Sequence, residues 1–409
     1  MKQVIKNFSL LLVVASAGLS LTACSSDNDG GSEVKKMAPE VKEWLSGQNG
    51  TAEKILASVI ENPASGDDDN PVVSPYGLNT MLSLTANAAE GDDRSVVLDY
   101  LDATDIHTLN RYNRTIINDL PKYDGKIQMG VANSIWASRN IAVRPEYSST
   151  VGEWYHAAIH NYNPANSDIV IDEINDWAKR NTNGLIQEIY HKGDKLREVM
   201  FVNALYFNGE WTEKFDEAKT ERGLFVCASG QRLTTPIMNS TRKAVVGTID
   251  GASVCSLPFG NGSFKITFIL PDNDVKSFLR NTNEGWLSEA IGLDHESEIP
   301  IDIYIPRFKV DFNYLFGDNE LGGRLNDLLA SQRVYSNLSA TPITIGQVMQ
   351  KVVFELDENG GRGAAVTFNG FISPGPDKNV FKLDRPFIFV VSNTDCSSPI
   401  FLGVVNKPS

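Results

Sequence analysis

Apolar residues recur at helical spacing in two stretches of the chain. In SPYGLNTMLSLTANAAEGDDRS (residues 74–95), positions three or four apart share one face, namely Leu78, Leu82, Ala86 and Ala89. We expect this helix to end at Gly91. In DEINDWAKRNTNGLI (residues 172–186), the shared face holds Ile174, Trp177 and Ala178, with Gly184 as the terminator. The pattern predicts two amphipathic helices.

Strand signals dominate the second half of the chain. Runs rich in β-branched and aromatic residues occur at 198–211, 264–271, 299–310, 349–356 and 385–392. Helical patterns therefore come mainly first and strand patterns mainly later, an order typical of α+β proteins with mostly antiparallel sheets. No repeat and no second linker interrupts residues 41–409, which we expect to form a single domain.

The N-terminal residues predict export. Residues 1–23 form a signal peptide pattern, with an apolar run too short for an ordinary transmembrane helix. LTAC (residues 21–24) resembles the lipobox of bacterial lipoproteins, although a plain signal followed by a cysteine is the alternative. The polar, acidic residues 24–40 suit a flexible tether. We expect lipid on Cys24 to anchor the protein to the bacterial outer membrane, facing the periplasm or the outside.

Charge and cysteine content narrow the function classes. The chain has 37 Lys and Arg against 51 Asp and Glu, a formal net charge of −14, which disfavours nucleic acid as a partner. Cys227, Cys255 and Cys396 cannot all pair, so the fold does not rest on a disulfide framework. One bridge is compatible with an exported protein, but we expect none.

No set of residues predicts an enzyme, a metal site or a cofactor site. His156 and His160 have the spacing of zinc ligands on a helix, but Ala157 replaces the glutamate of an H-E-x-x-H motif. A G-x-S-x-G nucleophile motif is absent. Ser74-Pro75 is most simply a helix cap followed by proline at the first helical position.

The stretch LDENGGRGAAVTFNGF (residues 356–371) is unusual because it combines glycines with strand-forming residues. Its glycines could form a phosphate-binding turn, but no following lysine supports that role, and a hairpin loop is the stronger alternative. With strand alternation, one face would carry almost no side-chain bulk, since it consists of Gly361, Gly363, Ala365 and Thr367, while Arg362, Ala364 and Val366 face the other way. Such a segment could add itself to a sheet.

The order of motifs along the chain resembles that of the serpin family over residues 50–409. The matching segments are NPVVSPYGLNTMLSLTANAAEGDDRS, VANSIWASRN, INDWAKRNTNGLI, FVNALYFNGEWTEKF, YIPRFKVDFNYLF, VVFELDENGG, RPFIFVVSN and PIFLGVVNKPS. The resemblance implies an α+β serpin fold of three β-sheets and about eight or nine helices, with an exposed reactive-centre loop. It also implies a monomer that traps serine proteases, and in some cases cysteine proteases, by inserting the cleaved loop as a new strand.

The resemblance assigns roles to individual residues. Glu358 corresponds to the hinge glutamate and Gly360 to the hinge glycine. The segment that inserts first contains Gly361, Gly363, Ala364, Ala365 and Thr367. The residues that correspond to the family's sheet-opening region are Ser74, Asn203, Trp211 and Gln350.

Four positions depart from the family pattern. Gly361 stands where threonine is usual and Gly363 where alanine is usual, which raises the entropy lost on insertion. Gln350 replaces a buried histidine, and Gly77 replaces a second serine. We expect Gln350 to form hydrogen bonds across the opening of the sheet and so to alter gating without abolishing it.

The scissile bond is predicted within residues 371–376. Counting from the hinge and from Pro386 places it at Pro374-Gly375 or Gly375-Pro376, but most serine proteases cut poorly before proline. We therefore favour Phe371-Ile372 or Ile372-Ser373, since Ser373-Pro374 is disfavoured for the same reason. The loop lacks lysine and arginine between residues 363 and 377, so elastase-, chymotrypsin- or subtilisin-like targets are expected.

Two other hypotheses remain from the sequence. The chain could be a non-inhibitory serpin that acts as a binding or adhesion module on the bacterial envelope, which the glycines of the hinge and Arg362 favour. An enzyme of unknown class rests only on the pair His156 and His160.

Overall fold

The computed structural model describes residues 36–62, 66–294, 297–316, 321, 323–345, 348–361 and 379–408. These belong to one compact unit, Val34–Ser409. The lipidation prediction at Cys24 lies outside the described residues. So do the predictions for the inserting segment and scissile bond after Gly361, namely Gly363, Ala364, Ala365, Thr367, Phe371, Ile372, Ser373, Pro374 and Gly375.

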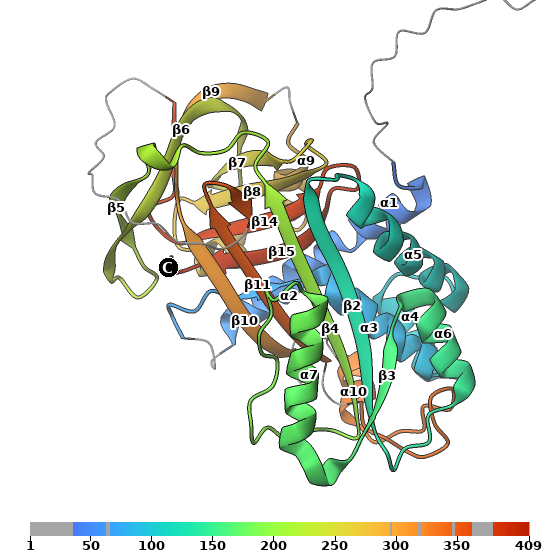
Figure 1. Ribbon diagram of the computed structural model, residues 1–409. Coiled ribbons are helices and arrows are strands. Elements are labelled where there is room, and N and C mark those ends of the chain that lie inside the picture. Colours follow the sequence, from blue (N-terminus) through green and yellow to red (C-terminus); the bar gives the residue numbers. More distant parts are fainter. Residues whose placement is uncertain are drawn as a thin grey trace, which may run out of the picture. The chain divides into compact units, whose positions relative to one another are not determined.

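Most helices come before the main strands, as the sequence predicted (Figure 1). The α-helices of the described residues are α1 (Pro39–Gly47), α2 (Asn49–Glu61), α3 (Pro75–Ala88), α4 (Gly91–Tyr100), α5 (Ile106–Asp119), α6 (Pro145–Tyr155), α7 (Ser167–Asn181), α8 (Val275–Asn281), α9 (Trp286–Gly292) and α10 (Gly323–Ala330). A single residue separates α1 from α2. No helix in this part of the chain is long and apolar enough to cross a bilayer.

The first predicted helix, α3, is buried on every side rather than on one face. All of its residues are buried, because strands β4 and β15 and helices α4, α5 and α6 surround it. Ser74 caps its N-terminus by accepting a hydrogen bond from Gly77 N–H at 3.1 Å, and Pro75 occupies the first turn. The helix ends at Ala88, and Gly91 begins α4 instead of ending α3, which corrects the predicted boundary.

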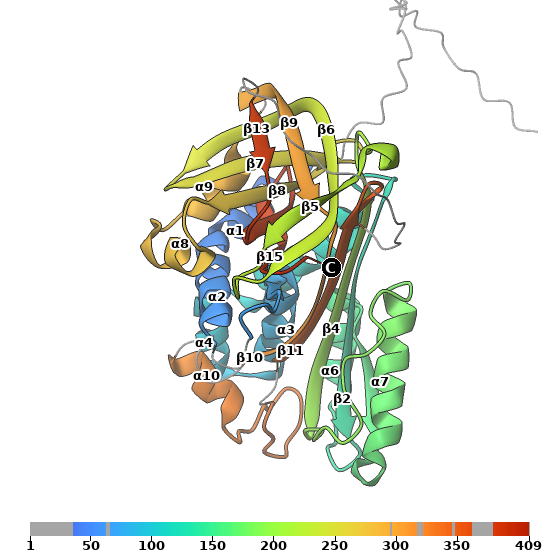
Figure 2. The same ribbon diagram turned by 90° about the vertical axis from the view of Figure 1, so that its left-hand side faces the viewer.

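A six-stranded central sheet has the order β10-β11-β12-β4-β2-β3. Its strands are β2 (Ile127–Ser138), β3 (Ala158–Tyr162), β4 (Val199–Glu210), β10 (Phe308–Phe316), β11 (Val348–Asp357) and β12 (Gly360–Gly361). Figure 2 shows this sheet nearly edge-on, with α7 on one side and α2 and α3 on the other. Separate apolar clusters fill its two faces, and Ile174 and Trp177 of α7 contribute to the smaller one.

The remaining strands form one nine-stranded sheet, in the order β1-β15-β14-β8-β7-β6-β9-β13 with β5 paired to β6. Its strands are β1 (Val72–Val73), β5 (Glu221–Val226), β6 (Arg232–Ile249), β7 (Ala252–Phe259), β8 (Phe264–Pro271), β9 (Glu298–Pro306), β13 (Val380–Lys382), β14 (Phe387–Asn393) and β15 (Ser398–Val405). The long strand β6 pairs with β5 and β9 along its first part and with β7 at its end. It thereby joins two of the three expected sheets.

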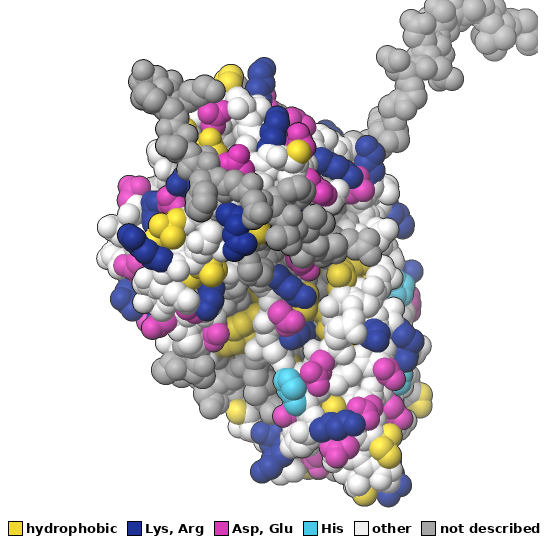
Figure 3. All heavy atoms as spheres, turned by 60° about the vertical axis from the view of Figure 1, so that its left-hand side comes forward, with side chains coloured by type: hydrophobic (Ala, Val, Ile, Leu, Met, Phe, Trp, Pro, Cys, Tyr) yellow, Lys and Arg dark blue, Asp and Glu magenta, His cyan; other side chains and the backbone are white. Residues whose placement is uncertain are grey.

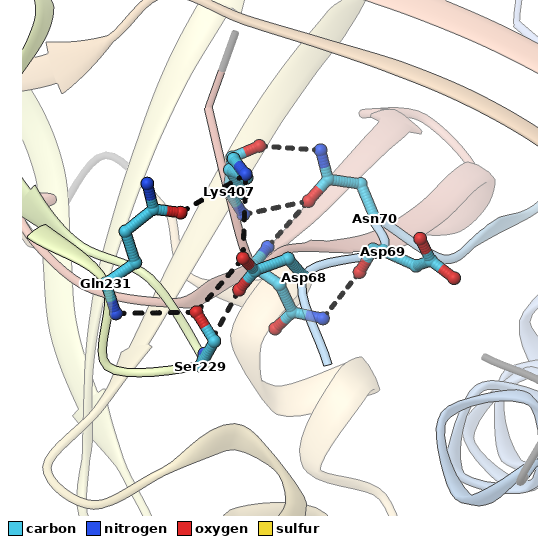
Figure 4. A network of polar contacts seen from close by, with 7 residues as sticks. Asp68, Asp69, Asn70, Ser229, Gln231 and Lys407 are labelled. Atoms are coloured by element: carbon cyan, nitrogen blue, oxygen red, sulfur yellow. Dashed lines mark hydrogen bonds and ion pairs between the residues drawn. The ribbon is translucent and has the colours of Figure 1, made fainter. Parts of the chain in front are cut away.

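The C-terminal end of the chain is held by a polar network (Figure 4). Asn70 accepts hydrogen bonds from the backbone N–H groups of Asn406 at 2.8 Å and Lys407 at 3.0 Å, and donates to the Lys407 carbonyl at 2.8 Å. Asp68 accepts two hydrogen bonds from Ser229, both at 3.0 Å, and lies 3.6 Å from Lys407 Nζ. This C-terminal network ties the end of the chain to the loop before β1 and to the turn between β5 and β6.

The two histidines that suggested a zinc site do not share a helix. His156 is the left-handed residue that ends α6, whereas His160 lies in strand β3. The His160 ring stacks on Trp136 with 4.2 Å between ring centroids, and burial lowers its pKa. The helical spacing on which the metal hypothesis rested is therefore wrong. Cys227, Cys255 and Cys396 are buried free thiols.

Candidate functional site

The hinge, residues 357–361, enters the central sheet as the short strand β12. Gly360 and Gly361 pair antiparallel with Asp357 and Leu356 of β11 on one side. On the other side they pair antiparallel with β4, Gly360 with Glu210 and Gly361 with Gly209. The glycines therefore lie between β11 and β4 and are hydrogen-bonded to both strands.

Only one end of β11 is paired directly with β4. Residues 348–351 of β11 form parallel ladder pairs with residues 201–204 of β4. Within the described residues, 352–355 of β11 and 205–208 of β4 pair neither with each other nor with β12. The sheet is thus closed at one end and separated at the other, where β12 lies. A strand that continued from β12 would lie between edges of β11 and β4 that pair with no other described strand.

Gly360 is required by the backbone at this position. Its φ is +141°, and a Cβ atom there would lie 2.0 Å from the Gly209 carbonyl oxygen. A Cβ atom on Gly361 would lie 2.8 Å from Phe354 Cε2. The Phe354 ring stacks on Phe389 in the core, with 5.5 Å between the ring centroids, and so has little freedom to move. The glycine that replaces the family's usual threonine therefore matches a position without room for a side chain.

The hinge glutamate is buried and paired. Glu358 is 2% exposed, and its Oε1 accepts hydrogen bonds from Arg307 Nε at 2.9 Å and Nη2 at 2.7 Å. The Thr220 hydroxyl donates to the same oxygen. Arg307 begins the chain that leads into β10, and Thr220 precedes β5. This ion pair fixes the start of the hinge between the two sheets.

Asp357 and Trp211 fix the turn before the glycines. The Asp357 carboxylate accepts the Asn359 backbone N–H at 2.7 Å, and the Trp211 indole donates to the Asp357 carbonyl at 2.8 Å. The Trp211 ring stacks on Phe259 with 4.7 Å between centroids. Burial raises the pKa of Asp357, partly offset by its hydrogen bonds to backbone N–H groups. Trp211 therefore contacts the hinge directly.

The other predicted sheet-opening residues meet beneath the sheet. Gln350 Oε1 accepts the Ser74 N–H at 2.7 Å, and Gln350 Nε2 donates to the Ser74 carbonyl at 2.9 Å. Gln350 and Asn203 are ladder partners, but the Asn203 amide donates to Asn133 at 2.8 Å. The expectation that the Gln350 side chain bonds across the opening is therefore wrong. It joins β11 to the start of α3 because the Ser74 backbone offers both a donor and an acceptor.

Two departures from the family pattern compensate for each other here. A Cβ atom on Gly77 would lie 2.5 Å from Asn203 Oδ1 and 2.8 Å from Gln350 Nε2. The absence of a side chain at Gly77 thus makes room for the amide of Gln350. A serine at residue 77 and a glutamine at residue 350 could not occupy these positions together without a shift.

Sequence reasoning missed several residues of this site, namely Thr220, Phe215, Arg242 and Arg307. Thr220 and Glu358 lie 138 residues apart in the chain. Neither periodicity nor spacing could have placed them together.

On the face shown in Figure 3, basic and acidic side chains are intermingled.

The family model described as serpin (serine protease inhibitor) matches residues 47–408. The chain is a serpin. Serpins are generally protease inhibitors rather than enzymes. The predicted α+β serpin fold is confirmed.

Individual relatives span nearly the whole serpin. Serpin-ZX of Arabidopsis thaliana is 27% identical over 394 residues, covering 90% of this chain and 99% of that protein. A protein of the same organism named "Probable non-inhibitory serpin-Z5" is 27% identical over 396 residues, covering 90% of this chain and 86% of that protein. The solved structure of Arabidopsis AtSerpin1 in its native stressed conformation has a TM-score of 0.76 and 26% identity, covering 91% of this chain and 100% of that chain.

Proposed function

We propose that this serpin is a single-use inhibitor of serine endopeptidases with apolar specificity. The observation that carries the proposal is strand β12, whose glycines pair with β11 and β4 at the end where these two strands do not pair with each other. The protease histidine takes the proton of the serine Oγ as this oxygen attacks the carbonyl carbon of the scissile bond. The protonated histidine then gives that proton to the leaving amine as the C–N bond breaks. Insertion then distorts the acyl-enzyme before water hydrolyses the ester.

The residues of the loop support an apolar target. The loop contains Phe368, Phe371 and Ile372 and lacks lysine and arginine between residues 363 and 377. A trypsin-like pocket requires a basic residue, whereas elastase-, chymotrypsin- and subtilisin-like pockets accept apolar ones. The proposed scissile bond is Phe371-Ile372 or Ile372-Ser373.

We also propose that the protein acts at the bacterial envelope, anchored through lipid on Cys24. Support comes from the lipobox-like LTAC and from the polar residues 24–40, which would act as a tether for the inhibitory domain. Mass spectrometry of the protein purified from membranes would show a diacylglycerol-modified Cys24 as the N-terminal residue. A chain that starts at any other residue would contradict the anchor.

A second candidate function is that of a non-inhibitory binding module. Glycine at residues 361 and 363 favours it, because each glycine raises the entropy lost when the loop becomes a strand. The similarity to a relative named as probably non-inhibitory adds to it. The position of Gly361 against Phe354 favours the inhibitory function instead, because glycine lacks the side chain that would clash with Phe354 when β12 forms.

Covalent complex formation tests the inhibitory function. The full chain in mild detergent is mixed with pancreatic elastase, neutrophil elastase, chymotrypsin or subtilisin, and the products are run on denaturing gels. We expect a band at the summed mass of protease and inhibitor, together with a C-terminal peptide whose first residue identifies the scissile bond. A protease whose serine has been blocked serves as the control. Cleavage without a complex by all four enzymes would contradict the proposal.

A further inference from the structure

The segment Trp211–Phe215, which follows β4, forms hydrogen bonds to the hinge backbone. Three consecutive hinge carbonyls accept hydrogen bonds from it. Trp211 Nε1 donates to Asp357 at 2.8 Å, Phe215 N–H to Glu358 at 3.0 Å, and Trp211 N–H to Asn359 at 2.9 Å. All three carbonyls precede Gly360. Residues that enter the sheet after β12 can therefore do so without breaking these bonds.

Arg242 of β6 holds the other side of the same segment. Its Nη1 donates to the Glu213 carbonyl at 2.6 Å, and its Nη2 donates to the Lys214 carbonyl at 3.3 Å. The guanidinium carbon lies 4.1 Å from the centre of the Phe215 ring. One planar group thus fixes three successive residues between β6 and the hinge.

The charge on Arg242 is held in an unfavourable environment. The residue is only 9% exposed, and burial lowers its pKa. The negative charge of Glu213 partly offsets this effect on the pKa, and Arg242 Nε donates to the Ser240 hydroxyl at 3.1 Å. Its direct contacts are backbone carbonyls, a hydroxyl and an aromatic ring. Burying a cation in this way costs free energy, which a neutral side chain of the same length would avoid.

We propose that Arg242 is a positioning residue that makes the Trp211–Phe215 segment a rigid pivot for the reactive loop. The inference rests on the proposed inhibitory function. After cleavage, insertion of the loop competes with hydrolysis of the acyl-enzyme. If this segment is less rigid, insertion is slower relative to hydrolysis of the acyl-enzyme. More protease is then released, and more moles of inhibitor are consumed for each mole of protease trapped. Arg242 contacts none of the described residues of β12, and it acts through the segment that holds the hinge.

The variants Arg242→Met and Arg242→Lys test this role. Methionine keeps much of the length and packing but removes the charge and the fork of donors, whereas lysine keeps the charge without the planar fork. With a protease that forms a complex, we expect R242M to raise the moles of inhibitor consumed per mole of protease about fivefold, as for loss of a charged hydrogen-bond donor. R242K should fall between R242M and the wild type, and the rate of first cleavage should not change.

Asn70→Ala provides a matched control, because it weakens the C-terminal network away from the hinge. All proteins are compared at the same interval below their melting temperatures. The inference would be overturned if R242M required no more moles of inhibitor per mole of protease than N70A.

Hydrogen exchange in the uncleaved full chain separates this inference from the proposed function. We expect R242M to accelerate exchange about tenfold at the N–H groups of Trp211 and Phe215, and N70A to leave them unchanged. If the wild type forms no complex with any protease, the inhibitory proposal fails and the exchange result alone decides whether Arg242 holds the segment. Unchanged exchange in R242M would overturn the inference in either case.

Discussion

Asp357 shows how one residue shapes the hinge at a cost in stability. Its carboxylate accepts the Asn359 N–H, yet burial raises its pKa. A carboxyl group whose pKa is higher in the folded than in the unfolded state binds its proton more tightly when folded. Its contribution to stability is therefore greatest at low pH and is lost as the pH rises through the folded pKa. At neutral pH the buried charge destabilises the fold.

The variant Asp357→Asn should therefore be more stable than the wild type at pH 7. Asparagine keeps an oxygen that accepts the Asn359 N–H but carries no charge. We expect its melting temperature to rise by about 1–2 °C at pH 7, and the difference from the wild type to shrink as the pH is lowered below 5. Differential scanning calorimetry across this range measures both effects. Asp357→Ala, which lacks the acceptor, should melt below the wild type, and an equally low D357N would refute the argument.

At single positions, sequence comparison found the residues with a family motif and missed their partners. Glu358 and Trp211, which occupy motif positions, lie at the hinge, and Ser74 lies beneath the central sheet. Arg307 lies in a matching segment that assigns it no role, and Arg242 lies in none. The fold brings Arg307 to Glu358 and Arg242 to the Trp211–Phe215 segment. The direction of the Gln350 side chain depended on the space left by Gly77, which a residue-by-residue reading could not weigh.

Among the elements, the short strand β12 depends on the absence of a side chain at Gly360. A Cβ atom there would lie 2.0 Å from a backbone oxygen that cannot move aside easily. We expect Gly360→Ala to displace β12 at a cost of about 1–3 kcal/mol, typical of overpacking, and to lower the fraction of protease trapped by about tenfold or more. Gel densitometry of complex against cleaved inhibitor gives this fraction.

Gly125→Ala is the control for that variant, because a Cβ atom at Gly125 meets nothing within 4 Å. It should trap protease as well as the wild type. A Gly360→Ala variant that traps equally well would show that β12 is not needed for insertion.

The hydrophobic pattern predicted helices and strands well where the apolar residues followed one helical or strand period. Helix α7 contains the expected apolar face, and its Ile174 and Trp177 pack on the central sheet. The pattern failed for α3, whose polar residues are also buried, since their hydroxyl and amide groups bond within the helix and to its neighbours. It also gave no sign of β6, because exposed polar residues such as Thr241 and Lys243 interrupt its apolar positions.

For the molecule as a whole, cleavage of the loop should raise stability if the loop inserts. A strand inserted between β11 and β4 would add roughly ten backbone hydrogen bonds, each worth about 1 kcal/mol net. We expect the melting temperature of the cleaved protein to rise by about 10–20 °C, given about 2 °C per kcal/mol for a large domain. Calorimetry before and after cleavage measures the change. An unchanged melting temperature would favour the binding-module hypothesis.

The paired glycines of β12 bear on the kinetics of insertion. Starting a new strand from a free loop requires ordering residues before any ladder bond forms, which makes nucleation the slow step. Here the first two residues are already ordered and bonded on both sides. If the cleaved loop inserts, insertion is propagation from an existing nucleus, so its rate should depend on residues beyond Gly361 and only weakly on the length of the loop.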